Sequence, residues 1–214
     1  MSLEQRSAEW FAWRNRGIGS SDAGVIMGVN EYRGIRELWL EKTGQVIREQ
    51  TSSEDSERGV RLEDKVVRLY CERTGLQMGP LTLEHPRFSF LRASLDDGNA
   101  ELRRFIEIKC PREYNHAKTR KTHYVKPEYI AQMQHQYLTT NYQACDFLSY
   151  YEAPDTPPEE YGELIVVPIE PDLEYMTELL EREIRFWHHV ETKTEPLLSD
   201  FLPWRRTVIQ DDVW

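Results

Sequence analysis

The sequence predicts an α/β protein whose central mixed β-sheet is flanked by helices on both faces. Segments with apolar residues at helical spacing fill the first third and the end of the chain, and five short apolar runs of strand character lie between them. A chain of 214 residues with 39% hydrophobic content and six tryptophans can bury one core. We therefore expect a single domain over residues 1–214.

The first part of the chain, about residues 1–75, is expected to be helical. The segments SAEWFAWRNR and GIRELWLEKTG carry apolar residues at helical spacing, and SSDAGVIMG between them opens with residues that favour helix N-caps. The polar stretch 49–59 is predicted to be a mobile loop. A further helix over 56–74 ends at Gly75. The residues expected on one face of this helix are Val60, Val67, Tyr70 and Cys71.

The sheet core is expected over about residues 76–170, and a C-terminal helix follows it. A helix at 127–141, with Pro127 acceptable in its first turn, interrupts the strands. A long amphipathic helix lies within about 171–193 and leads to a tail that ends in Trp214. The expected strands lie at 77–83, 88–95, 103–109, 145–152 and 163–170.

Composition argues against several classes of protein. Cys71, Cys110 and Cys145 are odd in number and widely separated, so neither a disulfide framework nor a CxxC-type zinc site is expected. No stretch approaches the roughly 20 apolar residues that cross a bilayer, and the N-terminus lacks the apolar run of a signal peptide. The net charge of −10 argues against a nonspecific basic coat but permits a locally basic groove. We expect a cytoplasmic protein without membrane association.

Residues 92–111, RASLDDGNAELRRFIEIKCP, are predicted to form a hairpin with charged residues at its open end. Alternate residues of a strand share a face, so Glu107 and Lys109 in IEIK point to one side and the two isoleucines point to the other. Asp96 is expected to leave its strand near the turn rather than directly opposite Glu107. Bringing the two carboxylates together therefore requires splayed strands or a turn that folds back.

This combination of charged residues is typical of phosphodiester hydrolysis. Carboxylates a few ångströms apart raise each other's pKa unless a cation lies between them, and Mg²⁺ takes one or two carboxylates together with waters and phosphate oxygens. A lysine beside the metal can orient or deprotonate the attacking water and neutralise charge that develops on phosphorus. The alternative for Asp96, Glu107 and Lys109 is a solvated hairpin edge whose charges pair across the surface.

The next segment, REYNHAKTRKTHYVK at 112–126, is locally basic in an acidic chain. It has five Lys/Arg residues against one Glu, with tyrosines and histidines between them. Such a patch can neutralise the phosphates of nucleic acid, and its alternative is a flexible solvated loop. Its basic residues are Arg112, Lys118, Arg120, Lys121 and Lys126.

Five ordered blocks, RGIGSSDAGVIMG, RGVRLEDKVVRLY, ASLDDG, EIKCP and YIAQMQHQY, span nearly all of residues 9–170. In this order they resemble the phage lambda exonuclease/YqaJ-type viral recombinase family, within the PD-(D/E)xK nuclease superfamily. The resemblance implies a restriction-endonuclease-like core and a Mg²⁺-dependent exonuclease that degrades one strand of linear duplex DNA from the 5′ end. It also implies a 3′ single-stranded overhang for a phage annealing protein in the bacterial host, and a ring-shaped homotrimer through which DNA threads.

The resemblance also implies a metal site. In it, Asp96, Glu107 and the backbone carbonyl of Ile108 hold a metal ion, and Lys109 acts on the attacking water. Glu63, in the RLED block, matches a helix carboxylate that helps to hold a second metal or its waters. Two Mg²⁺ ions are implied, for which Mn²⁺ can substitute.

Further residues are assigned to DNA by the same resemblance. Gln132 matches a glutamine that helps to hold the nucleophile or the scissile phosphate, and Tyr129 shares its helical face. Arg16 and Ser21 match an arginine and a serine that bind the DNA 5′ phosphate, which needs a bidentate cation and donors at a helix N-terminus. The alternative for Ser20 and Ser21 is plain N-capping. The basic segment is assigned to DNA as a whole.

Two assignments stay open because the sequence departs from the family pattern. The family usually has Asp-Gly at the first ligand, whereas this chain has Asp96-Asp97-Gly98, so Asp97 competes with the preferred Asp96. Arg14 competes with the preferred Arg16 for the 5′ phosphate.

Three functions follow as hypotheses. The first is the 5′→3′ duplex exonuclease of a phage-type recombination system. The second is another PD-(D/E)xK nuclease such as a Cas4-like enzyme, against which the three cysteines count because an iron–sulfur cluster normally needs four. The third is a non-catalytic DNA-binding module, which has no need to retain a metal site.

Overall fold

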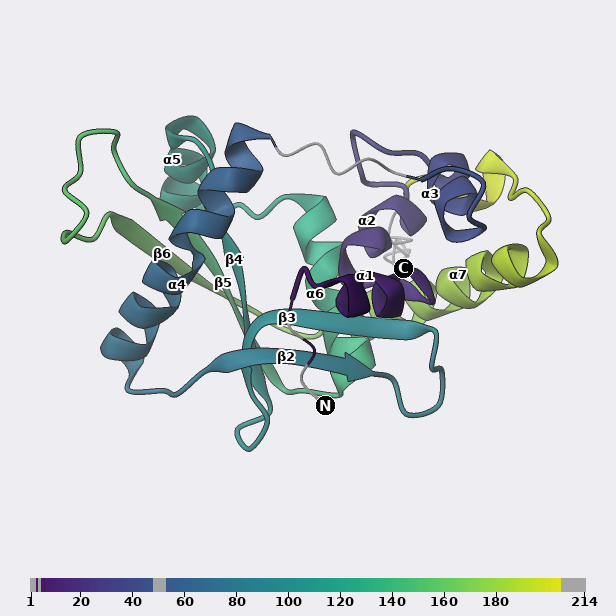
Figure 1. Ribbon diagram of the computed structural model, residues 1–214, viewed down its shortest axis with the longest axis horizontal. Coiled ribbons are helices and arrows are strands. Elements are labelled where there is room, and N and C mark those ends of the chain that lie inside the picture. The colour runs from purple at the N-terminus through teal and green to yellow at the C-terminus, as the bar shows by residue number, and fades with distance from the viewer. Residues whose placement is uncertain (1–2, 4, 48–52, 205–214) are drawn as a thin grey trace, which may run out of the picture.

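The computed structural model describes residue 3, residues 5–47 and residues 53–204, and its elements follow the order that Figure 1 shows. The helices are α1 (Ala8–Asn15), α2 (Ala23–Ile26), α3 (Ile35–Lys42), α4 (Glu54–Thr74), α5 (Glu113–Thr122), α6 (Pro127–Thr140) and α7 (Leu173–Thr192), with short 3₁₀ helices η1 (Ser20–Asp22) and η2 (Leu198–Phe201). The strands are β1 (Ile18–Gly19), β2 (Gly79–Glu84), β3 (Leu91–Asn99), β4 (Arg104–Lys109), β5 (Ala144–Tyr151) and β6 (Glu163–Ile169).

The sheet is mixed, as the sequence predicted. β3 and β4 are antiparallel, β4 and β5 are parallel, and β5 and β6 are antiparallel. β1 runs parallel to the start of β3, and β2 is antiparallel to β3. The parallel β4–β5 pair is connected through α5 and α6, because a crossover between parallel strands needs a long connection.

A gap opens along one side of β3. Arg92 pairs with both β1 and β2, and Gly98 pairs with both β2 and β4, so β1 and β4 lie on the same side of β3, away from β2. Pairing with β1 ends at Arg92, and pairing with β4 begins at Asp97. The carboxyl ends of β1 and β4 therefore approach each other across residues 93–96 of β3.

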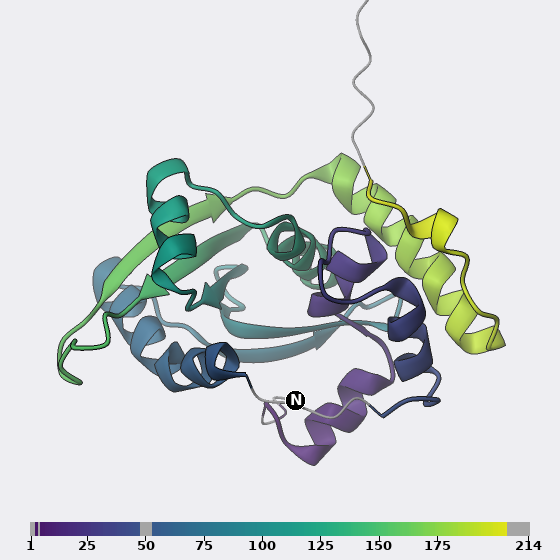
Figure 2. The same cartoon turned by 90° about the horizontal axis from the view of Figure 1, so that it is seen from above.

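The two faces of the sheet are covered by different helices (Figure 2). On one face, Ile106, Ile108 and Leu148 pack against α4, which contributes Leu62 and Val66. The opposite face packs against α6, and the cluster there contains Ala93, Leu95, Phe105, Met133, Tyr137 and Phe147. A separate cluster joins α2, α3, α7 and η2 beyond β1, where Figure 1 shows α7 beside α3. The sheet thus has an α4 face and an α6 face.

The structure corrects several details of the sequence prediction. Residues 113–122 of the basic segment form α5, a helix that was not predicted and that excludes the alternative of a flexible loop there. β3 runs to Asn99, past the expected end of its strand. α4 begins at Glu54, within the stretch that was predicted to be a mobile loop, and Ser53 is its N-cap. Residues 49–52 of that stretch and the tail with Trp214 lie outside the described residues.

The buried face of α4 also differs from the prediction. It consists of Leu62, Val66, Leu69 and Tyr70, whereas Val60 is exposed. Gly75 does end the helix, in a left-handed conformation with φ of 71°. Among the described residues, no helix combines the length and the apolar character of a membrane span.

Candidate active site

Asp96 and Glu107 meet at the gap between β1 and β4. The register that pairs Asp97 with Ile106 brings Asp96 alongside Glu107 on the α6 face, so no folded-back turn is needed. The strands separate at this point, and the Ile108 N–H donates to Asp96 Oδ2 at 2.8 Å instead of continuing the ladder. Asp96 therefore lies within β3 and not near a turn. The sequence DDGN, which is typical of turns, continues the strand.

Asp97, the competing candidate, lies on the other side of the sheet. It pairs with Ile106, whose side chain belongs to the cluster on the α4 face. Burial, together with the neighbouring carboxylates of Glu63 and Asp64, raises the pKa of Asp97 to about 7. The pairing of β2 with β3 shifts register between Leu81↔Leu95 and Gly79↔Gly98, so the alternation of side chains along β3 is interrupted after Leu95. This irregularity places Asp96, not Asp97, with Glu107.

Glu107 is completely buried, and each of its carboxylate oxygens accepts hydrogen bonds. Oε1 accepts from Gln132 Nε2 at 2.6 Å and from the ammonium of Lys109, while Oε2 accepts from Gln136 Nε2 at 2.8 Å. Because a buried carboxylate is costly unless its oxygens are bonded, these donors satisfy both oxygens of Glu107 and fix its orientation.

Gln136 is a residue that the sequence analysis missed. It follows Gln132 by one helical turn in YIAQMQHQY, so both amides lie on the same face of α6. The helical spacing of the two glutamines was the signal that could have identified it.

Lys109 lies among carboxylates and an aromatic ring. Its ammonium contacts Glu107 and lies 4.9 Å from the centroid of the Tyr129 ring. Burial alone would lower the pKa of Lys109, but the charges of Glu107 and Asp96 outweigh burial and raise it. Burial raises the pKa of Asp96 well above its ordinary value, and Glu107 adds to this effect. The site therefore holds carboxylates under strong mutual repulsion that Lys109 offsets in part.

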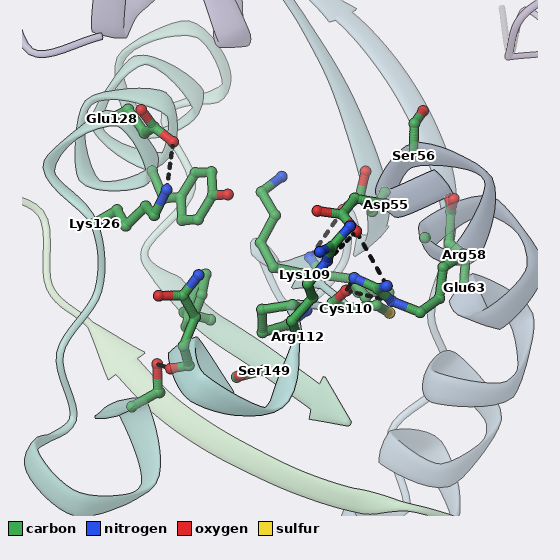
Figure 3. A pocket seen from close by; sticks show the side chains of 18 of the residues that line it. Asp55, Ser56, Arg58, Glu63, Lys109, Cys110, Arg112, Lys126, Glu128 and Ser149 are labelled. Carbon is green, nitrogen blue, oxygen red and sulfur yellow. Dashed lines mark hydrogen bonds and ion pairs between the residues drawn. The ribbon is translucent and has the colours of Figure 1, made fainter. Parts of the chain in front are cut away.

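Two cavities meet at these residues. The larger, of about 540 Å³, extends between α4 and the start of α6, and Glu63 and Tyr129 line it. Figure 3 shows Lys109 pointing into the space between Glu63 on α4 and the Lys126–Glu128 turn. The smaller cavity, of about 170 Å³, extends from the same carboxylates toward β1 and α1. Asp96 and Lys109 line both cavities.

The smaller cavity contains Arg14 and not the preferred Arg16. The Arg14 guanidinium donates to the Ser21 hydroxyl, and both residues line the cavity. Arg16 is exposed at the C-cap of α1 and does not line it. Ser20 lines the cavity as well, and its buried hydroxyl has no hydrogen-bond partner among the described residues. Neither serine has a side-chain capping bond at the N-terminus of η1, where Gly19 is the N-cap.

The basic segment reaches the larger cavity only in part. Arg112, the N-cap of α5, lines the cavity and forms ion pairs with Asp55 and Glu54. Arg120 pairs with Glu163, away from the cavity, and Lys118 lies over the Tyr124 ring. Lys121 is exposed, and Lys126 lines the cavity. The positive charge of this segment is thus partly neutralised within the chain.

The residues at the gap fit a divalent cation. In a strand the N–H and C=O of one residue point to the same side, so the Ile108 carbonyl faces Asp96 as its N–H does. Two carboxylates and one carbonyl suit Mg²⁺, which keeps several waters. No group of three or more His, Cys, Asp or Glu side chains in the described part of the chain is arranged to hold a metal ion. The site consequently offers a partial oxygen shell rather than a full protein cage.

The cysteines do not gather around a cluster. Cys110 packs on the α4 face of the sheet and Cys145 on the α6 face. Burial raises the pKa of both thiols. This arrangement disfavours the Cas4-like alternative.

A mixed sheet between helices, with an Asp on one strand and Glu-x-Lys on the next, defines the class of restriction-endonuclease-like nucleases. Comparison with known proteins agrees with this class. An alkaline exonuclease from Laribacter hongkongensis is 30% identical with a TM-score of 0.72, covering 87% of this chain and 94% of the other. Its complex with dAMP matches with a TM-score of 0.71 at 29% identity and the same coverage. A phage-related exonuclease from Haemophilus somnus 129PT, 13% identical over 83% of this chain and 96% of its own, shares the fold with a TM-score of 0.54.

The family model of the YqaJ-like viral recombinase domain matches residues 9–143. The chain belongs to this family, as its five sequence blocks predicted. YqaJ of Bacillus subtilis (strain 168) is 31% identical over 189 residues, which cover 86% of this chain. The chain spans 56% of the length of that relative.

Proposed function

We propose that this protein is a metal-dependent DNA exonuclease that digests one strand of linear duplex DNA from its 5′ end. The observation that carries the proposal is the meeting of Asp96, Glu107 and Lys109 where two cavities join. A strand that passes from one cavity into the other would place one phosphodiester at these residues. Family membership and the likeness to an alkaline exonuclease support the same activity.

Each residue of the site has a proposed part in hydrolysis. Asp96, Glu107 and the Ile108 carbonyl would hold Mg²⁺, or Mn²⁺ in its place, and Glu63 would help to hold a second ion or its waters. When bound, the metal supplies Lewis acidity toward the phosphate. Lys109 orients the attacking water and offsets the charge that grows on phosphorus. Gln132, bonded to Glu107, faces the smaller cavity and positions the nucleophile or the scissile phosphate.

The smaller cavity is proposed to hold the 5′-terminal nucleotide. Arg14 and Ser21 offer a cation and a hydroxyl, and the buried hydroxyl of Ser20 offers an unused donor. The related exonuclease from Laribacter hongkongensis has been crystallised with dAMP, a nucleotide that carries a 5′ phosphate. The larger cavity would then hold the rest of the strand, beside Arg112 and Lys126.

The products and partners are proposed from the family. Digestion from 5′ ends leaves 3′ single-stranded overhangs, which a single-strand annealing protein of the same recombination system would use in the bacterial cytoplasm. A ring-shaped homotrimer would keep the enzyme on DNA. Sedimentation analysis should then give a mass near three times the 25.4 kDa of one chain, and a monomer at all concentrations would reject the ring.

End-labelled DNA tests the polarity. Linear duplex carrying separate 5′ and 3′ labels is incubated with the protein in Mg²⁺ or, as the control, in EDTA. We expect Mg²⁺-dependent release of the 5′ label while the 3′ label stays on long single strands. Release of the 3′ label first would reject the polarity. Binding without release of either label would indicate a nuclease fold that is used only to bind DNA.

A further inference from the structure

Arg6 lies where the two cavities meet. Among the described residues, only Arg6, Asp96 and Lys109 line both cavities. The passage between the cavities is therefore bounded by a carboxylate, an ammonium and a guanidinium. The first two belong to the proposed catalytic site, whereas Arg6 comes from the start of the chain, before the matched family domain begins at residue 9.

The backbone at Arg6 is held over β3 from both sides. On one side, the Gln5 amide donates to the Leu95 carbonyl at 2.8 Å, directly before Asp96. On the other side, Ser7 caps α1 by accepting from Trp10 N–H, and the Trp10 indole donates to Ser94 Oγ at 3.0 Å. These contacts fix the N-terminal segment to the part of β3 that borders the gap.

Arg6 itself adopts a left-handed conformation with φ of 68°. Residues with a side chain seldom adopt this conformation, and those that do collect at functional sites where the surroundings hold them. Here the turn carries the chain from Gln5 into the N-cap of α1 and directs the Arg6 side chain to the passage.

The guanidinium bridges the cavity to α4. Arg6 Nη2 contacts Glu63 Oε2 at 3.0 Å, and half of the Arg6 side-chain surface is exposed. An exposed ion pair of this kind contributes little to stability, so it can be exchanged at little cost. A phosphate diester offers the paired oxygens to which a guanidinium binds in bidentate fashion.

We propose that Arg6 binds the phosphate that joins the 5′-terminal nucleotide to the next one, exchanging its contact with Glu63 for this phosphate. The inference rests on the proposed function, in which one phosphodiester spans the passage. Arg6 is then a substrate-binding residue that positions the linkage to be cleaved. When Arg6 leaves Glu63, that carboxylate faces the larger cavity without this partner. The exchange couples arrival of the DNA to a change of partner at Glu63.

Neutralising one phosphate at a time tests this assignment. Binding of 5′-phosphorylated duplex is measured by fluorescence anisotropy with Ca²⁺ in place of Mg²⁺, and gels verify that the DNA stays intact. The duplex carries a neutral methylphosphonate at the first linkage of the 5′ strand, at the fourth linkage, or nowhere. The proteins are wild type, Arg6→Ala, Arg6→Lys and Arg36→Ala. Arg36 is a matched control because it forms an exposed pair with Glu195, and neither residue lines either cavity.

On unmodified DNA we expect Arg6→Ala to raise the Kd about ten- to hundredfold, with Arg6→Lys intermediate and Arg36→Ala unchanged. On DNA with a neutral first linkage, Arg6→Ala and wild type should bind equally, whereas a neutral fourth linkage should preserve the difference. This comparison uses the same variant on two substrates, so a general loss of folding cannot imitate it. Equal losses on all three substrates would overturn the assignment.

The failure of this inference is distinguishable from failure of the proposed function. If wild type binds and digests DNA but Arg6→Ala behaves like Arg36→Ala, only the role of Arg6 is rejected. If wild type neither binds nor digests DNA, the proposed function is rejected and the role of Arg6 with it.

Discussion

At the scale of single residues, the site depends on how one buried carboxylate is held. Glu107 accepts from Gln132 and Lys109 at Oε1 and from Gln136 at Oε2. Lys109 and Gln132 line the smaller cavity, whereas Gln136 is completely buried. Oε1 is thus bonded to the two residues that line the smaller cavity, and Gln136 holds the carboxylate from the buried side.

Replacing Gln136 by Leu tests this support. The change substitutes an apolar side chain of similar size for the amide and leaves Glu107 Oε2 buried without its donor, which costs about 1–3 kcal/mol. We expect the free energy of unfolding, measured by urea denaturation at neutral pH, to fall by that amount, with a slower exonuclease rate. Gln143→Leu, at an exposed position, should leave both quantities unchanged. An equally stable and equally active Gln136→Leu protein would contradict the role.

Arg14 and Arg16 give a second test at this scale. Arg14 contacts Ser21 inside the smaller cavity, whereas Arg16 is exposed outside it. Because a hydrogen-bonded charge pair is worth about 1.5–3 kcal/mol, Arg14→Ala should reduce the preference for 5′-phosphorylated over 5′-hydroxyl ends about ten- to hundredfold. Arg16→Ala should retain that preference. Initial digestion rates on the two kinds of end decide between the arginines, and the reverse result would restore Arg16.

At the scale of elements, the wall of the smaller cavity depends on Asp22 at the end of η1. Its Oδ2 accepts from the Gly19 N–H at 2.9 Å and pairs with Lys42 at 2.8 Å, while Oδ1 pairs with Arg33 at 3.2 Å. The Lys42 side chain is only 2% exposed, so its charge depends on this partner. Asp22 thereby ties β1 and η1, which carry Ser20 and Ser21, to α3.

Asp22→Asn should destabilise the fold by about 3–5 kcal/mol, because it leaves a buried lysine without its counter-charge. The exposed pair of Arg36 and Glu195 supplies the control, and Glu195→Gln should change the free energy of unfolding by less than about 1 kcal/mol. Urea denaturation of the three proteins measures both effects.

The difference in free energy of unfolding between wild type and Asp22→Asn should depend on pH with a definite sign. Burial alone would raise the pKa of Asp22, but Lys42, Arg14 and Arg33 outweigh burial and hold the pKa well below its ordinary 3.8. The stability from Asp22 is therefore fully present above pH 3.8 and is lost as the pH falls toward the lower folded value. The difference between wild type and Asp22→Asn should be constant near neutral pH and should shrink below about pH 4. A difference that grows in acid would contradict this assignment.

The sequence predicted most elements because their signals are local. Periodicity, Pro127 and Gly75 identified α6 and α4, and alternation in IEIK separated the chemical face from the apolar one. α5 was missed because its contacts are with distant parts of the chain. His116 is buried, 2.9 Å from Ser149 Oγ on β5 and 3.1 Å from Glu163 on β6. These are partners that no local pattern reveals.

The sequence predicted only part of the candidate site, because some of its contacts also join distant parts of the chain. Family blocks supplied Asp96, Glu107 and Lys109, and the structure places all three together. The choice between Arg14 and Arg16 depended on how α1 meets η1, which spacing does not determine. The support from Gln136 depended on α6 packing over β4, and the sequence shows only that both glutamines share a helical face.

At the scale of the whole molecule, we propose that an acidic chain binds DNA through cations that are gathered in its two cavities. The net charge is −10, and several basic residues of the 112–126 segment form ion pairs or ring contacts within the chain. Attraction to DNA would therefore come from the cations inside the two cavities and from divalent metal at the carboxylates, not from a basic surface. The passage lined by Arg6, Asp96 and Lys109 is where these charges converge.

The most direct test of the catalytic assignment is single-turnover digestion of 5′-phosphorylated duplex DNA by Lys109→Ala, beside anisotropy measurements of DNA binding. Lys109 contacts Glu107 and lines both cavities, so its loss should abolish release of the 5′ label while the Kd for DNA changes less than about tenfold. Digestion by Lys109→Ala at the rate of the wild type would contradict the account.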